Sequence, residues 1–310
     1  MEQKKDYQLI IVGGGPAGLT AGIYAARGKL DVLLIERAIW GGQANYAEKI
    51  ENFPGFPQGL SGMELSELMH KQALQWGLKT LVAEVTGIAL EGEHKIVSTS
   101  EGDFRALAVI LASGAERSKL AVPGEQELLG RGVSYCATCD GAFFVDEVVA
   151  VIGGGDTAIN EALALTHHAR RVILIHRRDQ LRATRVLQER LATESKIQVL
   201  LDTVVEAIEG EERVNRLKLR NVKTGSISHL DVGGVFVAVG TRPNSAFIKD
   251  LLELDKQGQI VANDTLETKS PGIFAAGDIR HSSFKQCITA AGDGAAAAMA
   301  AERYLTERRK

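Results

Sequence analysis

The chain has only three cysteines in 310 residues, too few for the disulfide framework that small secreted domains need. It also has no apolar stretch near the roughly 20 residues of a membrane-spanning helix. The first residues, Met1–Asp6, lead into an apolar run that is too short for the core of a signal peptide. These absences exclude a disulfide-stapled or membrane-spanning protein, and we expect a cytoplasmic protein with no membrane partner.

A large excess of charge of one sign is missing as well. The 36 Lys and Arg residues and the 39 Asp and Glu residues leave a formal net charge of −3. Such a chain produces no strong field of either sign, which argues against nucleic acid or an anionic membrane as its main partner. At 310 residues the chain exceeds the size at which one hydrophobic core usually stops growing, so two domains are expected.

A glycine-rich motif occurs twice, each time after an apolar run. The first copy follows Leu9–Val12 and the second follows Val148–Ile152. The copies read Gly13, Gly14, Gly15, Pro16, Ala17, Gly18 and Gly153, Gly154, Gly155, Asp156, Thr157, Ala158, an offset of 153 − 13 = 140 residues. The next apolar run keeps this offset, since Val32–Ile35 recurs as Val172–Ile175. One glycine triplet is weak evidence, but two within matched strand–turn–helix–strand units predict two dinucleotide-binding domains.

In the first copy the spacing suits an unphosphorylated adenosine ribose. Gly13 permits the tight turn, Gly15 lets a pyrophosphate approach the backbone, and Gly18 lets the helix pack on the strand. The helix N-terminus then faces the phosphates. Glu36 ends the next apolar run, 36 − 13 = 23 residues after the first glycine, where a carboxylate binds a ribose diol and repels a 2′-phosphate. FAD or NAD is therefore favoured over a turn that is packed tightly for structural reasons alone.

In the second copy basic residues replace this acid. His176 stands where the first copy has Glu36, and it is followed by Arg177, Arg178 and Arg182. Guanidinium groups bind phosphate through paired, charge-assisted hydrogen bonds, so this site suits the 2′-phosphate of NADPH. Two contacts of about 1.5–3 kcal/mol each make NADPH preferred over NADH by at least roughly tenfold to a hundredfold.

A solvated basic helix is the alternative explanation for arginines in this region. Arg182, Arg185 and Arg190 lie in a charged amphipathic run, and we assign Arg185 and Arg190 to its solvated face. Asp156 stands at a helix N-terminus, where a carboxylate caps backbone amides, although it also lies near the pyrophosphate. Capping is the role that the sequence favours for Asp156.

Cys136 and Cys139 lie between the two glycine motifs. On the first turn of a helix this spacing puts both sulfurs on one face and within disulfide reach, and the helix N-terminus lowers a thiol pKa. A structural zinc site normally needs four ligands, and Cys287 is the only other cysteine. The pair is therefore predicted to be a reversible disulfide, with no metal site. Asp140, which follows directly, is either a proton donor or a helix cap.

The segment Gly132–Ala142, which contains the Cys-Ala-Thr-Cys-Asp motif, resembles the signature of the low-molecular-weight bacterial-type thioredoxin reductases. These are two-dinucleotide-binding flavoproteins, and the resemblance runs through nearly the whole chain. The other matching segments are 41–43, 51–55, 112–115, 176–182, 240–244, 272–278 and 285–289. As in that family, the cysteines lie inside the nucleotide-binding half and not beside the N-terminal motif, where glutathione reductase has them. Ser113 and Lys285 depart from the usual Thr and Arg.

This resemblance implies an α/β fold with two Rossmann-like, three-layer ββα dinucleotide-binding domains. The FAD-binding domain is discontinuous, residues 1–117 and 247–310, and the NADPH-binding domain, residues 118–246, is inserted into it and carries the cysteines. The FAD-binding residues implied are Gly13, Gly15, Pro16, Ala17, Gly18, Glu36, Arg37, Gly42, Gln43, Asn52, Ala112, Gly114, Gly277, Asp278, Lys285, Gln286 and Cys287. The NADPH-binding residues implied are Gly153, Gly155, Asp156, Thr157, Ala158, His176, Arg177, Arg178, Arg182 and Gly240.

The reaction that the resemblance implies is that of a thioredoxin reductase. NADPH passes a hydride to FAD, the reduced flavin opens the Cys136–Cys139 disulfide, and the dithiol reduces thioredoxin or a similar small disulfide protein. In this scheme Cys139 faces the flavin, Cys136 attacks the partner's disulfide, and Asp140 supplies the proton. A homodimer is implied too. Three alternatives stay open: a flavin-dependent dithiol oxidase, a reductase of another redoxin, and a non-catalytic flavin or NADPH redox sensor.

Overall fold

The computed structural model describes residues 5–47 and 49–308. The chain forms two compact units: unit 1, Met1–Glu116 with Arg242–Lys310, and unit 2, Arg117–Thr241, inserted between those segments. The units thus divide at 116/117 and 241/242, whereas the sequence predicts boundaries at 117/118 and 246/247. Strands β7 (Ala115–Arg117) and β16 (Thr241–Pro243) pair where the chain passes from one unit to the other.

Unit 1 is built on a seven-stranded sheet with the order β3-β2-β1-β6-β5-β4, in which β17 also pairs with β6. Its strands are β1 (Asp6–Val12), β2 (Val32–Glu36), β3 (Lys79–Val82), β4 (Val85–Glu91), β5 (His94–Thr99), β6 (Gly102–Leu111) and β17 (Ile273–Ala275). The β3, β2, β1, β6 and β17 strands pair in parallel, while β4, β5 and β6 form an antiparallel meander. The parallel register places Gly13 and Glu36 at the same carboxyl edge of the sheet.

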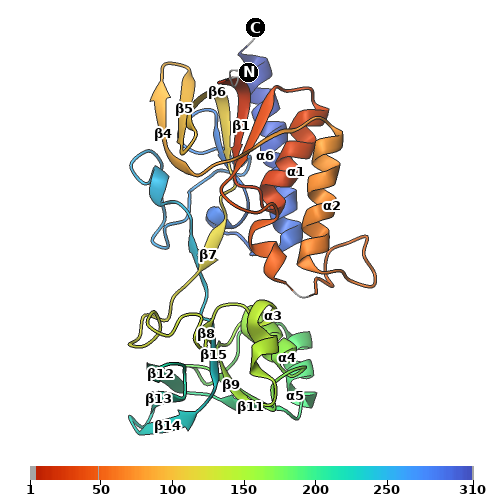
Figure 1. The fold of residues 1–310 in the computed structure, drawn as a ribbon. Helices are drawn as coiled ribbons and strands as arrows, with labels where there is room; N and C mark the ends of the chain where they lie inside the picture. The colour runs from red at the N-terminus through yellow and green to blue at the C-terminus, as the bar shows by residue number, and fades with distance from the viewer. Residues whose placement is uncertain (1–4, 48, 309–310) are drawn as a thin grey trace. The chain divides into compact units, whose positions relative to one another are not determined.

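Three helices cover one face of this sheet, α1 (Pro16–Arg27), α2 (Gly62–Gln75) and α6 (Cys287–Glu307), while the meander lies toward the other (Figure 1). Side chains of the buried β1 strand point alternately to the two faces of the sheet. Leu9 and Ile11 pack against the helices, and Ile10 packs on the opposite face. Helix α2 begins with a capping box between Ser61 and Glu64. Short 3₁₀ turns complete the unit: η1 (Gly42–Tyr46), η3 (Ala246–Ile248) and η4 (Gly277–Ile279).

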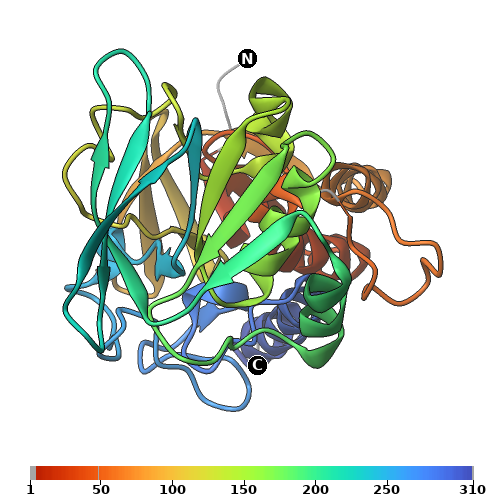
Figure 2. The same cartoon turned by 90° about the horizontal axis from the view of Figure 1, so that it is seen from below.

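Unit 2 has a five-stranded parallel sheet with the order β11-β10-β9-β15-β8. Its strands are β8 (Val133–Ser134), β9 (Val148–Gly153), β10 (Arg171–Ile175), β11 (Ile197–Leu200) and β15 (Gly234–Ala238). One face is covered by α3 (Ala137–Asp140), η2 (Gly141–Phe144), α4 (Asp156–Leu165) and α5 (Arg185–Thr193). An antiparallel sheet of β12 (Thr203–Glu209), β13 (Arg216–Asn221) and β14 (Ile227–Asp231) covers the other face (Figures 1 and 2).

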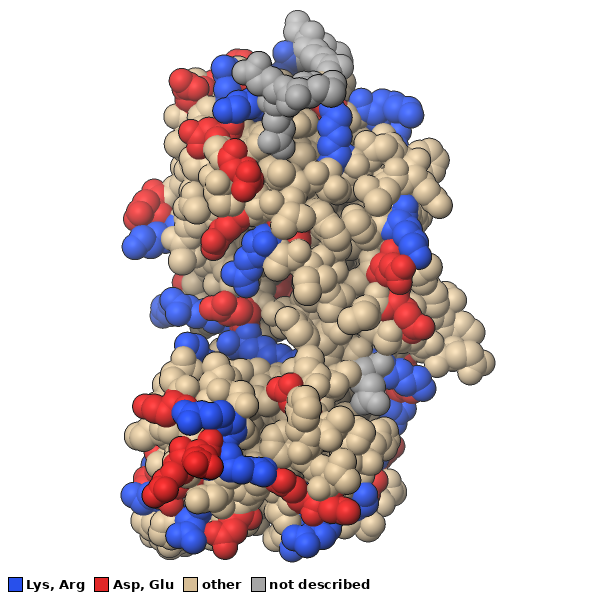
Figure 3. All heavy atoms as spheres, in the orientation of Figure 1, with Lys and Arg blue, Asp and Glu red and all other residues tan. Residues whose placement is uncertain are grey.

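Each unit is therefore a three-layer β–β–α structure around a parallel sheet, and the predicted α/β class with Rossmann-like sheets is confirmed. In the face drawn in Figure 3, acidic and basic side chains are interspersed within each unit. Among the described residues no helix has the length and apolar character needed to cross a bilayer. The two glycine motifs occupy equivalent positions. Each follows the carboxyl end of a strand of a parallel sheet, β1 in unit 1 and β9 in unit 2.

Candidate functional site

The first glycine motif forms the turn between β1 and α1. A Cβ at Gly13 would lie 2.4 Å from the carbonyl oxygen of Ala112, and one at Gly18 would lie 1.8 Å from that of Gly13, so neither position accepts a side chain. At Gly15 a Cβ would meet only the carbonyl oxygen of Gly41, at 3.9 Å. Gly15 is also the N-cap of α1, where no side chain caps the first-turn amides. The turn thus leaves open the space in which dinucleotide folds bind a pyrophosphate.

Glu36 lies at the end of β2, beside this turn. Its Oε2 accepts a hydrogen bond from the amide of Gly14 over 2.7 Å, and its Oε1 accepts one from the amide of Ala38 over 3.0 Å. Trp40 packs on the same turn, since a Cβ at Gly14 would lie 2.7 Å from its ring. The carboxylate is therefore held in one orientation, with lone pairs left to accept hydrogen bonds from a ribose diol.

Predicted FAD-contacting residues from distant segments meet in unit 1. Asn52 Nδ2 donates a hydrogen bond to Gln286 Oε1 over 2.9 Å, although 234 residues separate the two. The turn after β17 packs against the start of α1, because a Cβ at Gly277 would lie 2.9 Å from Cβ of Ala17. The fold thus gathers the first motif and the segments near residues 52 and 286 into one unit, as a common ligand requires.

The other residues predicted for this site take several positions. Gly42 and Gln43 begin η1, and Gly114 follows β6 with a φ of +64° and open space at its Cβ position. Arg37 and Lys285 are exposed.

Asp278 and Cys287 are titratable groups of the same region. Burial raises the pKa of the Asp278 carboxyl, against the opposing effects of Ser283 and Lys285, and Ser283 Oγ donates a hydrogen bond to it over 2.9 Å. Cys287 is the first residue of α6, and burial together with neighbouring Asp278 raises the pKa of its thiol. Cys287 is therefore a protonated, weakly nucleophilic thiol near neutral pH.

The second glycine motif forms the corresponding turn between β9 and α4. A Cβ at Gly153 would lie 2.4 Å from the carbonyl oxygen of Ala238, whereas one at Gly155 would meet nothing within 4 Å. Asp156 is the first residue of α4, but it does not cap that helix. Its Oδ1 accepts a hydrogen bond from the amide of Thr184 over 2.7 Å. The predicted capping by Asp156 is therefore wrong, because its carboxylate fixes the loop between β10 and α5, and the first turn of α4 stays open to a phosphate.

His176 follows β10 and is 5% exposed. Its ring lies against the second turn, where a Cβ at Gly154 would come within 2.3 Å of Nδ1. Burial, and then the charges of Arg182, Arg178 and Arg177, lower the pKa of this histidine, so the ring is neutral near pH 7. Its Nε2 has no hydrogen-bond partner among the described residues. A buried polar atom of this kind is costly unless a ligand or water satisfies it, and the three exposed guanidinium groups suit an anionic ligand.

Lowering the pH is expected to destabilise the fold through His176. Because the folded-state pKa lies below the ordinary value of 6.5, the unfolded chain binds more protons in the window between the two values. The stabilisation is fully present above about pH 6.5 and is lost as the pH falls toward the folded-state pKa. Between about pH 7.5 and about pH 5 the melting temperature of His176→Gln should fall less than that of the parent chain. The difference should be about 2–4 °C for each kcal/mol of pH-dependent destabilisation that the substitution removes.

The matched control for this prediction is His229→Gln, at an exposed position of unit 2. This variant should keep the pH dependence of the parent chain. A full pH dependence in His176→Gln would contradict the neutral, buried state of that ring.

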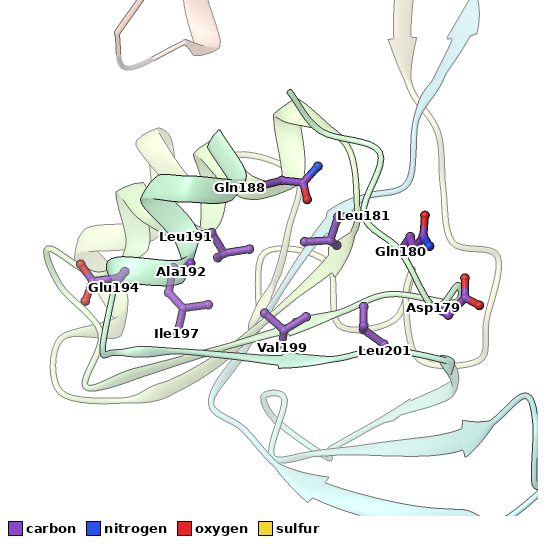
Figure 4. A pocket seen from close by; sticks show the side chains of 10 residues that line it. All are labelled: Asp179, Gln180, Leu181, Gln188, Leu191, Ala192, Glu194, Ile197, Val199 and Leu201. Atoms are coloured by element: carbon purple, nitrogen blue, oxygen red, sulfur yellow. The ribbon is translucent and has the colours of Figure 1, made fainter. Parts of the chain in front are cut away.

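A pocket of about 610 Å³ lies between the loop after β10, helix α5 and strand β11 (Figure 4). Its lining is mainly apolar on the helix and strand and polar on the loop: Asp179, Gln180, Leu181, Gln188, Leu191, Ala192, Glu194, Ile197, Val199 and Leu201. The pocket borders the predicted NADPH residues in the sequence but includes none of them. Its loop residues, Asp179–Leu181, lie directly between Arg178 and Arg182 in the sequence.

Cys136 and Cys139 form a disulfide, with their Cα atoms 5.4 Å apart. Cys136 is the N-cap of α3, and its Sγ accepts a hydrogen bond from the amide of Cys139 over 3.1 Å. Cys136 is buried and Cys139 is exposed. An amide that donates to a cysteine sulfur in this way stabilises a thiolate on that sulfur.

Asp140 is tied to the backbone of Cys136 through one hydroxyl. Ser134 Oγ donates a hydrogen bond to Asp140 Oδ2 over 2.6 Å and accepts one from the amide of Cys136 over 3.0 Å. The Asp140 side chain therefore does not cap a helix in this structure. It stands as an oriented acid beside the disulfide.

Comparison with known proteins agrees with this geometry. The model of the family described as "Pyridine nucleotide-disulphide oxidoreductase" matches residues 7–294. The chain is 46% identical over 302 residues to the thioredoxin reductase of Mycolicibacterium smegmatis, covering 97% of each chain. It is 46% identical over 303 residues to the bifunctional thioredoxin reductase/thioredoxin of Mycobacterium leprae, covering 97% of this chain and 66% of that one. The crystal structure of Lactococcus lactis thioredoxin reductase matches with a TM-score of 0.95 at 43% identity, over 97% of this chain and 99% of that one.

The chain belongs to the thioredoxin reductases of this family. Thioredoxin reductases use FAD and NADPH, and the residues of this structure fit both groups. Unit 1 offers an open helix N-terminus with the fixed Glu36 carboxylate, and unit 2 offers a second open helix N-terminus with the unpaired Nε2 of His176. The fit therefore rests on features of the folded chain as well as on the motifs.

Sequence reasoning missed a buried carboxylate of this thioredoxin reductase. Glu161 of α4 is 7% exposed, and its Oε2 accepts a hydrogen bond from the amide of Ala137 over 2.6 Å. Arg117 Nη1 donates to its Oε1 over 2.5 Å. Burial raises the pKa of the Glu161 carboxyl and the Arg117 charge opposes that rise. A signal was present, because Glu161 lies on the apolar side of its helix with Ala158 and Ala162.

A second missed group supports the turn after β17. Asp293 of α6 accepts hydrogen bonds from the amide of Gly277 over 3.0 Å and from Arg280 through Nε and Nη2, over 2.6 and 2.9 Å. This bidentate pair holds the turn that carries Asp278. No spacing in the sequence marks the pair, since its members lie on different elements.

Proposed function

We propose that this thioredoxin reductase carries two electrons from NADPH, through FAD and the Cys136–Cys139 disulfide, to the disulfide of thioredoxin. The observation that carries the proposal is a disulfide at the start of α3, in the unit that also bears the second glycine turn. When bound, FAD accepts the hydride of NADPH and delivers two electrons to the disulfide. The net reaction converts NADPH, a proton and a protein disulfide into NADP⁺ and a protein dithiol.

Unit 1 is proposed to hold FAD. The amides of the first turn of α1 bind the pyrophosphate, Glu36 binds the adenosine ribose, and Asp278 lies toward the ribitol side. The hydrogen bond between Asn52 and Gln286 holds two further contact segments together. The other members of this proposed site are Gly13, Gly15, Pro16, Ala17, Gly18, Arg37, Gly42, Gln43, Ala112, Gly114, Gly277, Lys285 and Cys287.

Unit 2 is proposed to hold NADPH. Arg177, Arg178 and Arg182 bind the 2′-phosphate, and His176 donates or accepts one hydrogen bond through Nε2. The amides of the first turn of α4, exposed because Asp156 turns away from them, bind the pyrophosphate. Gly153, Gly155, Thr157, Ala158 and Gly240 complete the proposed site.

The hydrogen bond from the Cys139 amide to Cys136 Sγ supports different roles for the two cysteines. Cys136 thiolate attacks one sulfur of the thioredoxin disulfide, so that a mixed disulfide forms and one thioredoxin thiolate leaves. Cys139 thiolate then attacks Cys136 Sγ, which restores the enzyme disulfide and releases the second thioredoxin thiolate. Asp140, oriented by Ser134, supplies or holds the proton that lets the Cys139 thiolate, which faces the flavin, leave in the reductive half of the cycle.

A homodimer and a reducing compartment belong to the same proposal. Unit 1 exposes several large apolar side chains on α2 and the loops near it: Ile39, Tyr46, Met63, Leu68, Leu74 and Trp76. Such side chains on one unit support a subunit interface there, and sedimentation velocity measures the assembly. A dithiol that works through repeated reduction is suited to the cytoplasm, where thiols are kept reduced.

The visible spectrum of the purified protein tests the proposed function. We expect a flavin spectrum that NADPH bleaches under anaerobic conditions, and NADPH consumption that requires added thioredoxin. Consumption driven by oxygen alone would assign the chain to the dithiol oxidases. Bleaching without turnover on thioredoxin would point to another redoxin, and a flavin that NADPH does not bleach would point to a sensor.

A further inference from the structure

The amide that follows Cys136 is bound by a buried ion pair. Ala137, the first residue of α3, donates its amide to Glu161 Oε2 over 2.6 Å, and Arg117 binds the other carboxylate oxygen over 2.5 Å. The two side chains are 8% and 19% exposed. One peptide unit therefore separates the carboxylate from the nucleophilic cysteine, in surroundings where water screens charge poorly.

The two charges of the Arg117–Glu161 pair have opposite effects on the stability of a thiolate at Cys136. The amides of a first helical turn stabilise a thiolate, but the amide of Ala137 is engaged by Glu161 and only that of Cys139 is directed at Cys136 Sγ. The Glu161 charge disfavours a second negative charge nearby, and the Arg117 charge favours it. Burial raises the pKa of the Glu161 carboxyl, while the Arg117 charge and the hydrogen bond from the Ala137 amide lower it.

We propose that the Arg117–Glu161 ion pair sets the ionisation of Cys136 in the reduced enzyme, with Glu161 opposing the thiolate and Arg117 restoring it. Both are positioning residues in this proposal, since they act through Cys136. The proposal deepens the proposed function, because it concerns the nucleophile of that reaction. It predicts that removing the two charges one at a time has opposite effects.

The other charged groups around Cys136 are not substituted in the test. On its own element Asp140 accepts a hydrogen bond from Ser134, and its charge raises the pKa of Glu161. From the preceding segment Tyr135 donates a hydrogen bond to buried Glu125. From the segment after α4, His168 lies near Gly141, where a Cβ would come within 3.4 Å of its ring.

The experiment measures the rate of Cys136 alkylation by iodoacetamide as a function of pH. The background is full-length Cys139→Ser enzyme with bound FAD, and the modified Cys136 peptide is quantified by mass spectrometry, so that Cys287 does not interfere. In Glu161→Gln we expect the midpoint of the pH profile to fall by about one pH unit. In Arg117→Met we expect it to rise by a similar amount, and the double variant should return close to the background.

Two further variants make the result decisive. Asn160→Lys adds the same +1 change as Glu161→Gln at the exposed neighbouring position of α4, and it should leave the midpoint unchanged. Arg117→Lys keeps the charge and should also leave it unchanged, so a conclusion does not depend on the folding of Arg117→Met. The proposal is overturned if Glu161→Gln leaves the midpoint in place, or if both single variants move it in the same direction, as a loosened helix would cause.

The measurement separates this proposal from the proposed function. Alkylation uses neither NADPH nor thioredoxin. If the midpoint of the alkylation profile shifts as expected in an enzyme that fails to reduce thioredoxin, the ion-pair proposal therefore stands. An enzyme that reduces thioredoxin but shows no shift overturns the ion-pair proposal alone.

Discussion

Cys136→Ser enzyme should lose thioredoxin reduction by at least about a thousandfold, while NADPH still bleaches its flavin. Serine has no sulfur with which to form the mixed disulfide, so the route to the partner is closed. The sites proposed for FAD and NADPH lie on other elements and do not change. Anaerobic stopped-flow absorbance measures flavin reduction, and steady-state NADPH consumption with thioredoxin measures turnover.

The matched control is Thr138→Ser, which introduces the same residue at the exposed position between the two cysteines. We expect it to keep both activities. Undiminished thioredoxin turnover by Cys136→Ser would show that electrons leave the flavin by a route that avoids this cysteine pair.

The double variant Arg177→Ala/Arg178→Ala should raise the KM for NADPH by about 10- to 100-fold and leave the KM for NADH nearly unchanged. Both guanidinium groups are exposed at the end of β10, beside the neutral ring of His176. Their proposed contacts are with the 2′-phosphate, which NADH lacks. Initial rates of anaerobic flavin reduction over a range of each nucleotide measure the effect, and the penalty should shrink at high salt because the contacts are ionic.

Arg185→Ala/Arg190→Ala is the control for this prediction. It removes the same two positive charges from α5, where both side chains are exposed. We expect a change of less than about threefold for NADPH, from the weaker long-range field alone. Equal losses in the two double variants would mean that net charge, and not contact with the 2′-phosphate, sets the preference for NADPH.

The sequence was sufficient to predict the elements whose causes are local. The apolar runs before each glycine motif are continuous because parallel strands are buried on both faces, and β1, β2, β9 and β10 occur where those runs stand. Gly13 and Gly18 need glycine because neighbouring backbone atoms fill the space of a side chain. These constraints act within a few residues, so one sequence reveals them.

The sequence did not reveal the interactions between residues of distant segments. Asp156 has the sequence context of a helix cap, yet its carboxylate binds the amide of Thr184, 28 residues later. Glu161 lies among the apolar positions of its helix, which marks it as buried, but its partners Arg117 and the Ala137 amide become visible only in the fold. Partners of this kind depend on how elements pack, and neither spacing nor composition encodes them.

The boundary between the units shows the same limit. The sequence predicts the second crossing at residue 246/247, whereas unit 2 ends at Thr241. Asn244 belongs to unit 1, where it exchanges hydrogen bonds with Ser113 through its carbonyl oxygen and its Nδ2. Gly240 and Pro243 mark a turn near this boundary in the sequence, but the contact between Asn244 and Ser113, 131 residues apart, is visible only in the fold.

The pairing of β17 with β6 affects the order in which the protein is made. Unit 2 is a continuous stretch and can fold as soon as it leaves the ribosome. Unit 1 begins first but lacks β17 and α6 until the last segment has been synthesised. The nascent polypeptide must therefore keep an incomplete sheet soluble while the inserted half matures, and the FAD site proposed in unit 1 cannot be completed before unit 2 has been synthesised.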